Sequence, residues 1–316
     1  MSRYIIRRLL LLAVTMLVTS LIIFGLTQVI PGDVAQLILG REAGEQALAD
    51  FRAEFGLDDP LPVQYVNWLG GFVTGDWGRS FTSGNPAVRP LVMERLGNSM
   101  RLATMTLIIS VPVSILLGVL AALWEDSWLD NLISVLSLSV VGLPEFVTGL
   151  LLINGIALGI KSLGLPATSS VPDGTLEDWI RQLILPSLTA TFVLLGYIAR
   201  LTRAGVLDEL KKPYVRTATL KGLPYRAVIF KHVLRNALLP TITVIALSVG
   251  WLIGGLVVIE NVYNYPGLGA LMVDAVKQKN LLMLQAIVMV TIFFFALANL
   301  VADLLYAVLN PRIRLE

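Results

Sequence analysis

Six long apolar stretches constrain the fold of this chain more than any other feature of its sequence. A helix needs about 20 mostly apolar residues to cross a lipid bilayer. The stretches that reach this length are residues 9–30, 102–124, 132–160, 183–201, 237–259 and 282–308. Only 15% of the 316 residues are charged, whereas soluble domains carry about 25%. The sequence therefore predicts an all-α, multi-pass membrane protein with six transmembrane helices.

The residue content also argues against several kinds of chemistry. The chain has no cysteine, so it can form no disulfide and offers no thiol nucleophile. His232 is its only histidine, which argues against a zinc site of the usual histidine-rich kind. The net charge of +2 gives no basic field of the kind that attracts nucleic acid. We therefore expect no metal site, no catalytic residues and no nucleic-acid partner.

The first and third apolar stretches need separate interpretation. Arg3, Arg7 and Arg8 precede the first stretch, as in a secretory signal peptide, but the apolar run is longer than the roughly 7–15 residues of such signals. We therefore interpret residues 1–30 as a retained first transmembrane helix. The third stretch contains Pro144. Because proline removes a backbone donor and crowds the preceding turn, we expect a kink or a tilt there.

The distribution of lysine and arginine predicts the orientation in the membrane. Basic residues gather at the N-terminus, between residues 200 and 235, and at Arg312 and Arg314. If the N-terminus lies inside, six helices place all of these regions in the cytoplasm. The loop at 125–131 departs from the rule, because it is acidic and has no basic residue. We predict that both termini are cytoplasmic and that residues 310–316 form a cytoplasmic tail.

Residues 31–99 are too many for a simple turn, and we interpret them as an extracytoplasmic helical insert. Three short apolar faces at helical spacing support this interpretation. They are Ala47, Leu48, Phe51 and Phe55 before Gly56, then Val66, Leu69 and Phe72, then Val88, Leu91 and Leu96 after Pro86. The insert is either a small helical cap or a docking surface for an external partner.

Residues 202–236, between the fourth and fifth stretches, are patterned as two short helices around a turn. Pro213 suits a first helical position, and Gly222 suits the left-handed residue that follows a helix end. Leu223 would fold back on the first helix, and Pro224 would open the second. The basic residues of this segment suit contact with anionic lipid, but lipid contact does not require a helix–glycine–helix arrangement. We favour a rigid element that inserts into a groove of another protein.

The same segment resembles the "EAA" loop of binding-protein-dependent ABC importer permeases. The matching residues are Arg216-Thr217-Ala218, Gly222, His232-Val233-Leu234-Arg235-Asn236-Ala237-Leu238 and Leu239-Pro240. The variant with His-x-Leu-Arg-Asn-Ala is similar to the dipeptide/oligopeptide/nickel branch, in particular its first permease subunit (the OppB/DppB type). Further matches cover nearly the whole chain, at Tyr4-Ile5-Ile6-Arg7-Arg8, Pro31-Gly32-Asp33, Gly56-Leu57-Asp58-Asp59-Pro60-Leu61, Gln64-Tyr65, Trp68-Leu69, Gly75-Asp76-Trp77-Gly78-Arg79-Ser80, Glu260-Asn261-Val262-Tyr263 and Pro266-Gly267-Leu268-Gly269.

The resemblance implies a type I ABC importer transmembrane domain, with its permease core at residues 100–309. This chain and a second permease subunit would form the pathway, with two cytoplasmic ATPases and an extracytoplasmic substrate-binding protein, in a bacterial or archaeal plasma membrane. No G-x-x-x-x-G-K-[ST] motif occurs here, so the ATPases would bind ATP and Mg²⁺, and this chain would hold no cofactor and would not be an enzyme. The residues to which the resemblance assigns coupling to the ATPases are Tyr214, Val215, Arg216, Thr217, Ala218, Lys221, Gly222, Leu223, Pro224, His232, Arg235 and Asn236.

Glu145 is the one carboxylate well inside a predicted membrane helix, where a charge is costly unless it is paired or hydrated. It either lines the pathway and meets a cationic group such as a peptide amine, or it is protonated or paired with an arginine of the partner permease. His232 is interpreted as a packing or capping residue of the loop, with pH sensing as the alternative.

The family branch implies peptides as the leading substrate, with nickel, glutathione-like compounds and sugars as alternatives. The main rival interpretation is a secondary transporter or channel. That class predicts inverted repeats or paired charges at the membrane midplane, and the sequence shows neither. A membrane enzyme is a second rival, but one histidine, no cysteine and no H-E-x-x-H motif leave few catalytic arrangements.

Overall fold

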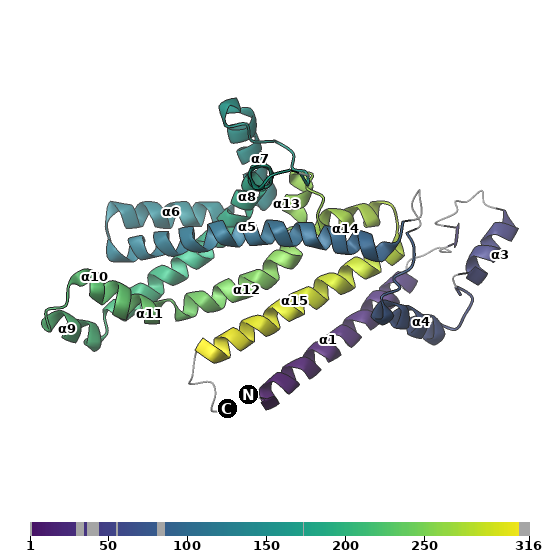
Figure 1. The fold of residues 1–316 in the computed structure, drawn as a ribbon, viewed down its shortest axis with the longest axis horizontal. Helices are drawn as coiled ribbons and strands as arrows, with labels where there is room; N and C mark the ends of the chain where they lie inside the picture. The colour runs from purple at the N-terminus through teal and green to yellow at the C-terminus, as the bar shows by residue number, and fades with distance from the viewer. Residues whose placement is uncertain are drawn as a thin grey trace. The chain divides into compact units, whose positions relative to one another are not determined.

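The computed structural model describes residues 2–29, 35–36, 44–54, 56–80, 86–172 and 174–309. Within these ranges the regular structure is helical, apart from an isolated β-bridge between Arg79 and Ala87 (Figure 1). The chain divides into two compact units, one of residues 1–98 and 267–294 and the other of residues 99–266 and 295–316. Three predicted features lie outside the described residues: the motif at 31–33, Phe55 and the tail at 310–316.

In the described residues, the first unit contains four helices of its own and the first parts of two long ones. The helices are α1 (Ser2–Val29), α3 (Glu45–Glu54), α4 (Leu61–Thr74) and α14 (Leu268–Lys277), with the first parts of α5 (Val88–Leu123) and α15 (Leu281–Leu309). The Tyr65 hydroxyl of α4 and the buried Ser20 hydroxyl of α1 lie 2.8 Å apart. The third short helix expected after Pro86 is instead the start of α5, because the helix runs on from Val88 without a break.

The second unit holds the remaining described helices and the later parts of α5 and α15. The elements are α6 (Trp128–Gly142), α7 (Glu145–Leu152), the π-helix η1 (Ile153–Leu158), the 3₁₀-helix η2 (Lys161–Leu163), α8 (Leu176–Leu210), α9 (Pro213–Leu220), α10 (Tyr225–Ala227), the π-helix η3 (Val228–Val233), α11 (Leu234–Ala237), α12 (Leu239–Gly255) and α13 (Val257–Val262).

Helix α8 runs through the core of the second unit. A capping box of Thr175 and Asp178 starts it. Its side chain Ile198 is fully buried in a cluster with residues of α5, α12 and α13, such as Leu102, Leu252 and Ile259. Glu260 of α13 is buried as well, and it accepts a hydrogen bond of 2.5 Å from the Ser99 hydroxyl of α5. This carboxylate therefore joins two helices of the core.

The described helices agree in part with six membrane spans. Four of them, α1, α5, α8 and α15, are long and apolar enough to cross a membrane. Two bent pairs bring the number to six if each pair counts as one span: α6 with α7 and η1, bent by 109°, and residues 225–237 with α12, bent by 50°. The kink expected at Pro144 is confirmed, but it is so sharp that residues 132–160 do not form one straight helix.

Candidate functional site

The segment 202–236, called the basic loop from here on, begins inside α8 and continues as α9 to α11. Gly222 follows α9 with φ of +76°. Its N–H donates to Thr219 O at 3.0 Å, and the N–H of Leu223 donates to Ala218 O at 3.4 Å. These two bonds form a Schellman motif, the turn in which a left-handed residue ends a helix. The turn that the sequence predicts at Gly222 is therefore confirmed.

One side of the basic loop is buried within this chain. Pro213 is the first residue of α9, where its missing N–H costs no helical bond. Val215 and Ala218 then face inward, and Ala218 is only 8% exposed. They join an apolar cluster with the ends of α5 and α8 and with η3 and α11. The other members of this cluster are Ala122, Val206, Leu207, Val228, Ile229, Val233 and Ala237.

Polar contacts fasten α9 to the neighbouring helices. The Tyr214 hydroxyl donates to Glu209 Oε1 at 2.7 Å and to the His232 carbonyl at 3.3 Å. Asn236 Nδ2 donates to the Tyr214 hydroxyl at 3.4 Å. Burial and the bond to Glu209 raise the pKa of Tyr214, so its proton stays in place at neutral pH. His232 takes part through its backbone carbonyl, so the packing or capping role expected for its side chain stays a prediction.

The exposed side of the basic loop combines apolar and cationic residues. Leu220 is 78% exposed and Phe230 is 72% exposed, and Tyr225 lies between them in sequence and is exposed too. The exposed cations of the same segment are Lys211, Lys212, Arg216, Lys221, Arg226, Lys231 and Arg235. We call this side the docking face. The three apolar residues are not among the coupling residues predicted above, although large apolar side chains in so basic a segment are the signal that marks them.

Glu145 lies directly after the sharp bend, as the first residue of α7. A carboxylate at this position is favoured by the positive end of the helix dipole. The sequence did not reveal that a helix begins at Glu145. Its Oε2 atom is buried and has no hydrogen-bond partner in the described part of the chain. The residue lines a cavity of about 500 Å³ whose other walls include Val193 of α8 and Trp251 of α12. Both alternatives for Glu145 remain open on this geometry.

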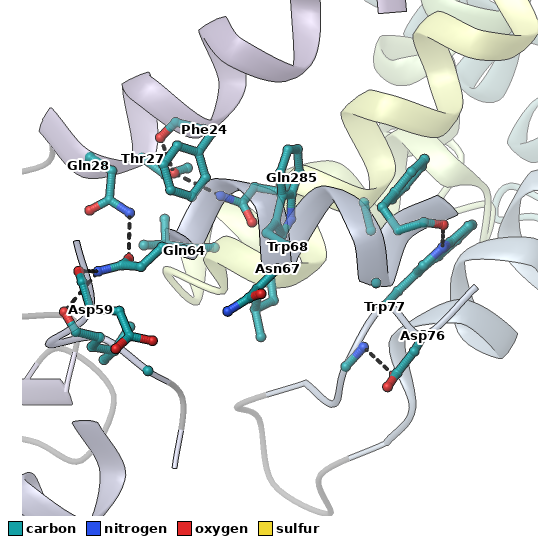
Figure 2. A pocket seen from close by; sticks show the side chains of 18 residues that line it. Phe24, Thr27, Gln28, Asp59, Gln64, Asn67, Trp68, Asp76, Trp77 and Gln285 are labelled. Carbon is teal, nitrogen blue, oxygen red and sulfur yellow. Dashed lines mark hydrogen bonds between the residues drawn. The ribbon is translucent and has the colours of Figure 1, made fainter. Parts of the chain in front are cut away.

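A second cavity, of about 460 Å³, lies in the first unit and is lined by several motif residues (Figure 2). Gln64 Nε2 donates to the carbonyls of Leu57 and Asp59 at 2.9 and 2.8 Å. The rings of Phe72 and Trp77 stack with their centroids 5.0 Å apart. These bonds and ring contacts join residues of the first unit to one another, so the motif residues shape the walls of this cavity.

Two protein families match the chain, and their matched ranges adjoin at residue 114. The family described as "Binding-protein-dependent transport system inner membrane component" matches residues 114–315. The family described as "Binding-prot-dependent transport system membrane comp, N-term" matches residues 1–114. The first range contains the whole basic loop and Glu145, and the second contains the insert.

Relatives with named functions match the chain over nearly its whole length. The "Probable peptide ABC transporter permease protein y4tP" of Sinorhizobium fredii is 38% identical over 314 residues, which is 99% of this chain and 100% of the relative. The "Glutathione transport system permease protein GsiC" of Escherichia coli K12 is 37% identical over 314 residues, 99% of each chain. The protein of the same name from Salmonella typhimurium has the same identity and coverage.

Proposed function

The chain belongs to the family of binding-protein-dependent transport system inner membrane components, the permease subunits of ABC importers, and from this premise we propose its working arrangement. It forms the transport pathway together with a second permease subunit. Two cytoplasmic ATPases bind ATP and Mg²⁺, and an extracytoplasmic binding protein delivers the substrate. The chain is a transport component and not an enzyme. The observation that carries the proposal is the docking face of the basic loop.

The docking face has the composition of a protein interface. Large apolar side chains act as anchors in such interfaces, with charged groups around them at the rim. Leu220 and Phe230 supply the anchors, and the surrounding cations supply the rim. The buried side of the loop packs on the ends of α5 and α8. A displacement of the docking face by an ATPase is therefore passed to two long helices of the chain.

Burial divides the predicted coupling residues into two groups, to which we assign different roles. Arg216, Lys221 and Arg235 are exposed and suit direct contact with an ATPase. Val215 and Ala218 are buried in this chain, so they hold the docking face in position. A charge placed at Ala218 would therefore disrupt this chain before it disrupted an interface.

The substitution Leu220→Asp tests the docking face. Leu220 is exposed, so the change should leave the abundance of the permease unaltered, but loss of an apolar anchor should weaken ATPase association about tenfold. The measurements are co-purification of the ATPases and ATP hydrolysis stimulated by loaded binding protein. Leu176→Asp is the matched control, because Leu176 is 77% exposed at the other end of α8. Equal association in both variants would refute the role of the docking face.

The proposed topology places both termini and the basic loop in the cytoplasm and residues 31–99 outside, where they contribute to the landing surface for the binding protein. The chain has no native cysteine, so single cysteines report position without background. A cysteine at the exposed Val73 should react with a membrane-impermeant thiol reagent in intact spheroplasts. A cysteine at Phe230 should react only after the membrane is opened. The reverse pattern would overturn the orientation.

Peptides are the proposed substrate class. One relative is named as a peptide permease and others as glutathione permeases, and glutathione is itself a peptide-like molecule with a free amine. Nickel and sugars are the remaining alternatives. Mass spectrometry of the ligand carried by the cognate binding protein decides among these classes, and a ligand without peptide character would exclude the proposal.

A further inference from the structure

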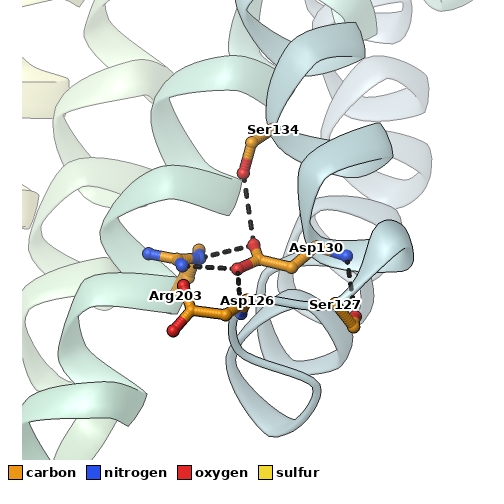
Figure 3. A network of polar contacts seen from close by, with 5 residues as sticks. All are labelled: Asp126, Ser127, Asp130, Ser134 and Arg203. Carbon is orange, nitrogen blue, oxygen red and sulfur yellow. Dashed lines mark hydrogen bonds and ion pairs between the residues drawn. The ribbon is translucent and has the colours of Figure 1, made fainter.

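A bidentate ion pair joins α6 to α8 across 73 residues of sequence (Figure 3). Arg203 Nε donates to Asp130 Oδ1 at 2.7 Å, and Arg203 Nη2 donates to Asp130 Oδ2 at 2.6 Å. Asp130 Oδ2 also accepts from the Asp126 N–H at 3.1 Å, and Oδ1 accepts from the Ser134 hydroxyl at 3.3 Å. Every oxygen of this carboxylate therefore has two donors.

This pair differs from an ordinary surface salt bridge. The Asp130 side chain is 4% exposed and the Arg203 side chain 30%. Two parallel bonds between a guanidinium and a carboxylate fix the orientation of both groups as well as their distance. About two turns away along both helices the backbones pack closely: an added Cβ at Gly196 of α8 would lie 2.6 Å from the carbonyl of Ser137 in α6. Helices α6 and α8 are therefore held in one register.

The pair lies at the start of the basic loop, next to the apolar cluster on which α9 packs. One turn beyond Arg203, Val206 and Leu207 of α8 belong to the apolar cluster that contains Val215 and Ala218 of α9. The other end of α6 leads into the bend at Leu143 and Pro144, which both line the cavity beside Glu145. Helix α6 thus connects a point near the basic loop with the cavity.

We propose that Arg203 and Asp130 are positioning residues that tie α6 to α8, so that a displacement of the basic loop moves α6 and reshapes the cavity at Glu145. The inference rests on the proposed function and names the connection inside the chain. Because coupling is reciprocal, the same tie carries the signal of a loaded binding protein back to the ATPases. The acidic loop at 125–131, which departs from the positive-inside rule, receives its basic partner from α8 through this pair.

The test removes the tie without leaving a buried charge alone. In Asp130→Asn with Arg203→Gln both charges are lost together, and such paired replacement is far better tolerated than loss of one partner. We expect the assembled complex to keep its yield and its basal ATP hydrolysis. Stimulation of ATP hydrolysis by loaded binding protein should fall at least about fivefold, and uptake per ATP should fall with it. Stimulation equal to that of the unmodified complex would refute the tie.

A second arm uses the absence of native cysteine. The double variant Asp130→Cys with Arg203→Cys is assembled with ATPases free of reactive cysteines and treated with a short, reducible bifunctional thiol reagent. Cross-linking should restore stimulation, and reduction should abolish it again in the same sample, whatever the yield of the variant. A monofunctional reagent should restore nothing. Complete cross-linking without recovery would show that no tie at this point carries the signal.

The outcomes separate this inference from the proposed function. If the unmodified complex shows no ATP-driven uptake, the proposed function itself fails. Suppose instead that the unmodified complex transports substrate. If the paired variant then keeps full stimulation, or complete cross-linking brings no recovery, the permease assignment stands and only the tie is refuted.

Discussion

Asp130 and Glu145 are acidic residues in the first turns of two consecutive helices, α6 and α7. They differ in the hydrogen-bond donors that surround their carboxylates. Asp130 accepts hydrogen bonds from Arg203, Asp126 and Ser134. Glu145 borders a cavity, and one of its oxygens is buried without a partner in the described residues. Helix α6 begins with a side-chain cap from Ser127, whereas α7 begins after Pro144, which offers none.

The difference shows how one residue type serves two purposes in a membrane protein. A carboxylate whose acceptor positions are filled by its own chain has no capacity left for a ligand, so it fixes the positions of helices. A buried carboxylate oxygen without a partner destabilises the protein unless something else satisfies it. The position beside a cavity, at the positive end of a helix, supports the hypothesis that Glu145 meets a cationic substrate group, with a protonated or paired carboxyl as the alternative.

Of the predicted changes, removal of Arg203 should have the largest effect. Arg203→Ala leaves the buried Asp130 charge without its main partner, which costs about 3–5 kcal/mol in comparable sites. The free energy of unfolding, measured by denaturant titration in detergent micelles, should fall by that amount. Arg181→Ala is the control: its ion pair with Glu177 is exposed, and such pairs contribute at most about 1 kcal/mol. Similar losses in the two variants would mean that Asp130 is not specially dependent on its partner.

Neutralising the other carboxylate should leave stability nearly unchanged and alter transport. Glu145→Gln gives up the helix-dipole interaction, about 0.3–1 kcal/mol, but also removes a half-buried charge. If Glu145 receives a substrate amine, the substrate concentration at half-maximal uptake should rise about tenfold, the equivalent of one charge-assisted hydrogen bond. Uptake of an amino-terminally acetylated peptide serves as the control and should not change. If the variant and the unmodified protein take up both substrates with the same kinetics, Glu145 has a structural role.

The sequence predicted those features that depend on neighbouring residues. Pro213 and Gly222 specify a helix start and a left-handed turn within ten residues, and the structure has both. The kink at Pro144 was predicted for the same reason, since a proline acts on its own turn. The size of the bend was not predicted, because it depends on how α7 packs against α8 and α13.

The features that depend on tertiary contacts stayed hidden. Arg203 and Asp130 lie just outside two different predicted spans, in the basic loop and in the acidic loop at 125–131. No local pattern shows that their side chains meet. The burial of Ala218 was missed as well, because the apolar cluster beneath it comes from α5, α8 and η3. The helices extend beyond the predicted spans at several ends: α8 runs from Leu176 to Leu210, since polar residues can continue a helix after the apolar stretch stops.

The smallest expected effect concerns the side-chain cap that α6 has and α7 lacks. Ser127 Oγ accepts a hydrogen bond from the Asp130 N–H at 3.3 Å, and loss of such a cap costs about 1 kcal/mol. Ser127→Ala should lower the free energy of unfolding by this amount. Thr15→Ala is the control, because the exposed Thr15 hydroxyl bonds only to the Leu11 carbonyl of its own helix, and it should cost less than about 0.5 kcal/mol. Because Ser127 and Arg203 both act on Asp130, the combined variant Ser127→Ala with Arg203→Ala should cost less than the two losses added together. Strict additivity would show that the cap and the ion pair hold α6 independently, and the contrast with Glu145 would then rest on the ion pair alone.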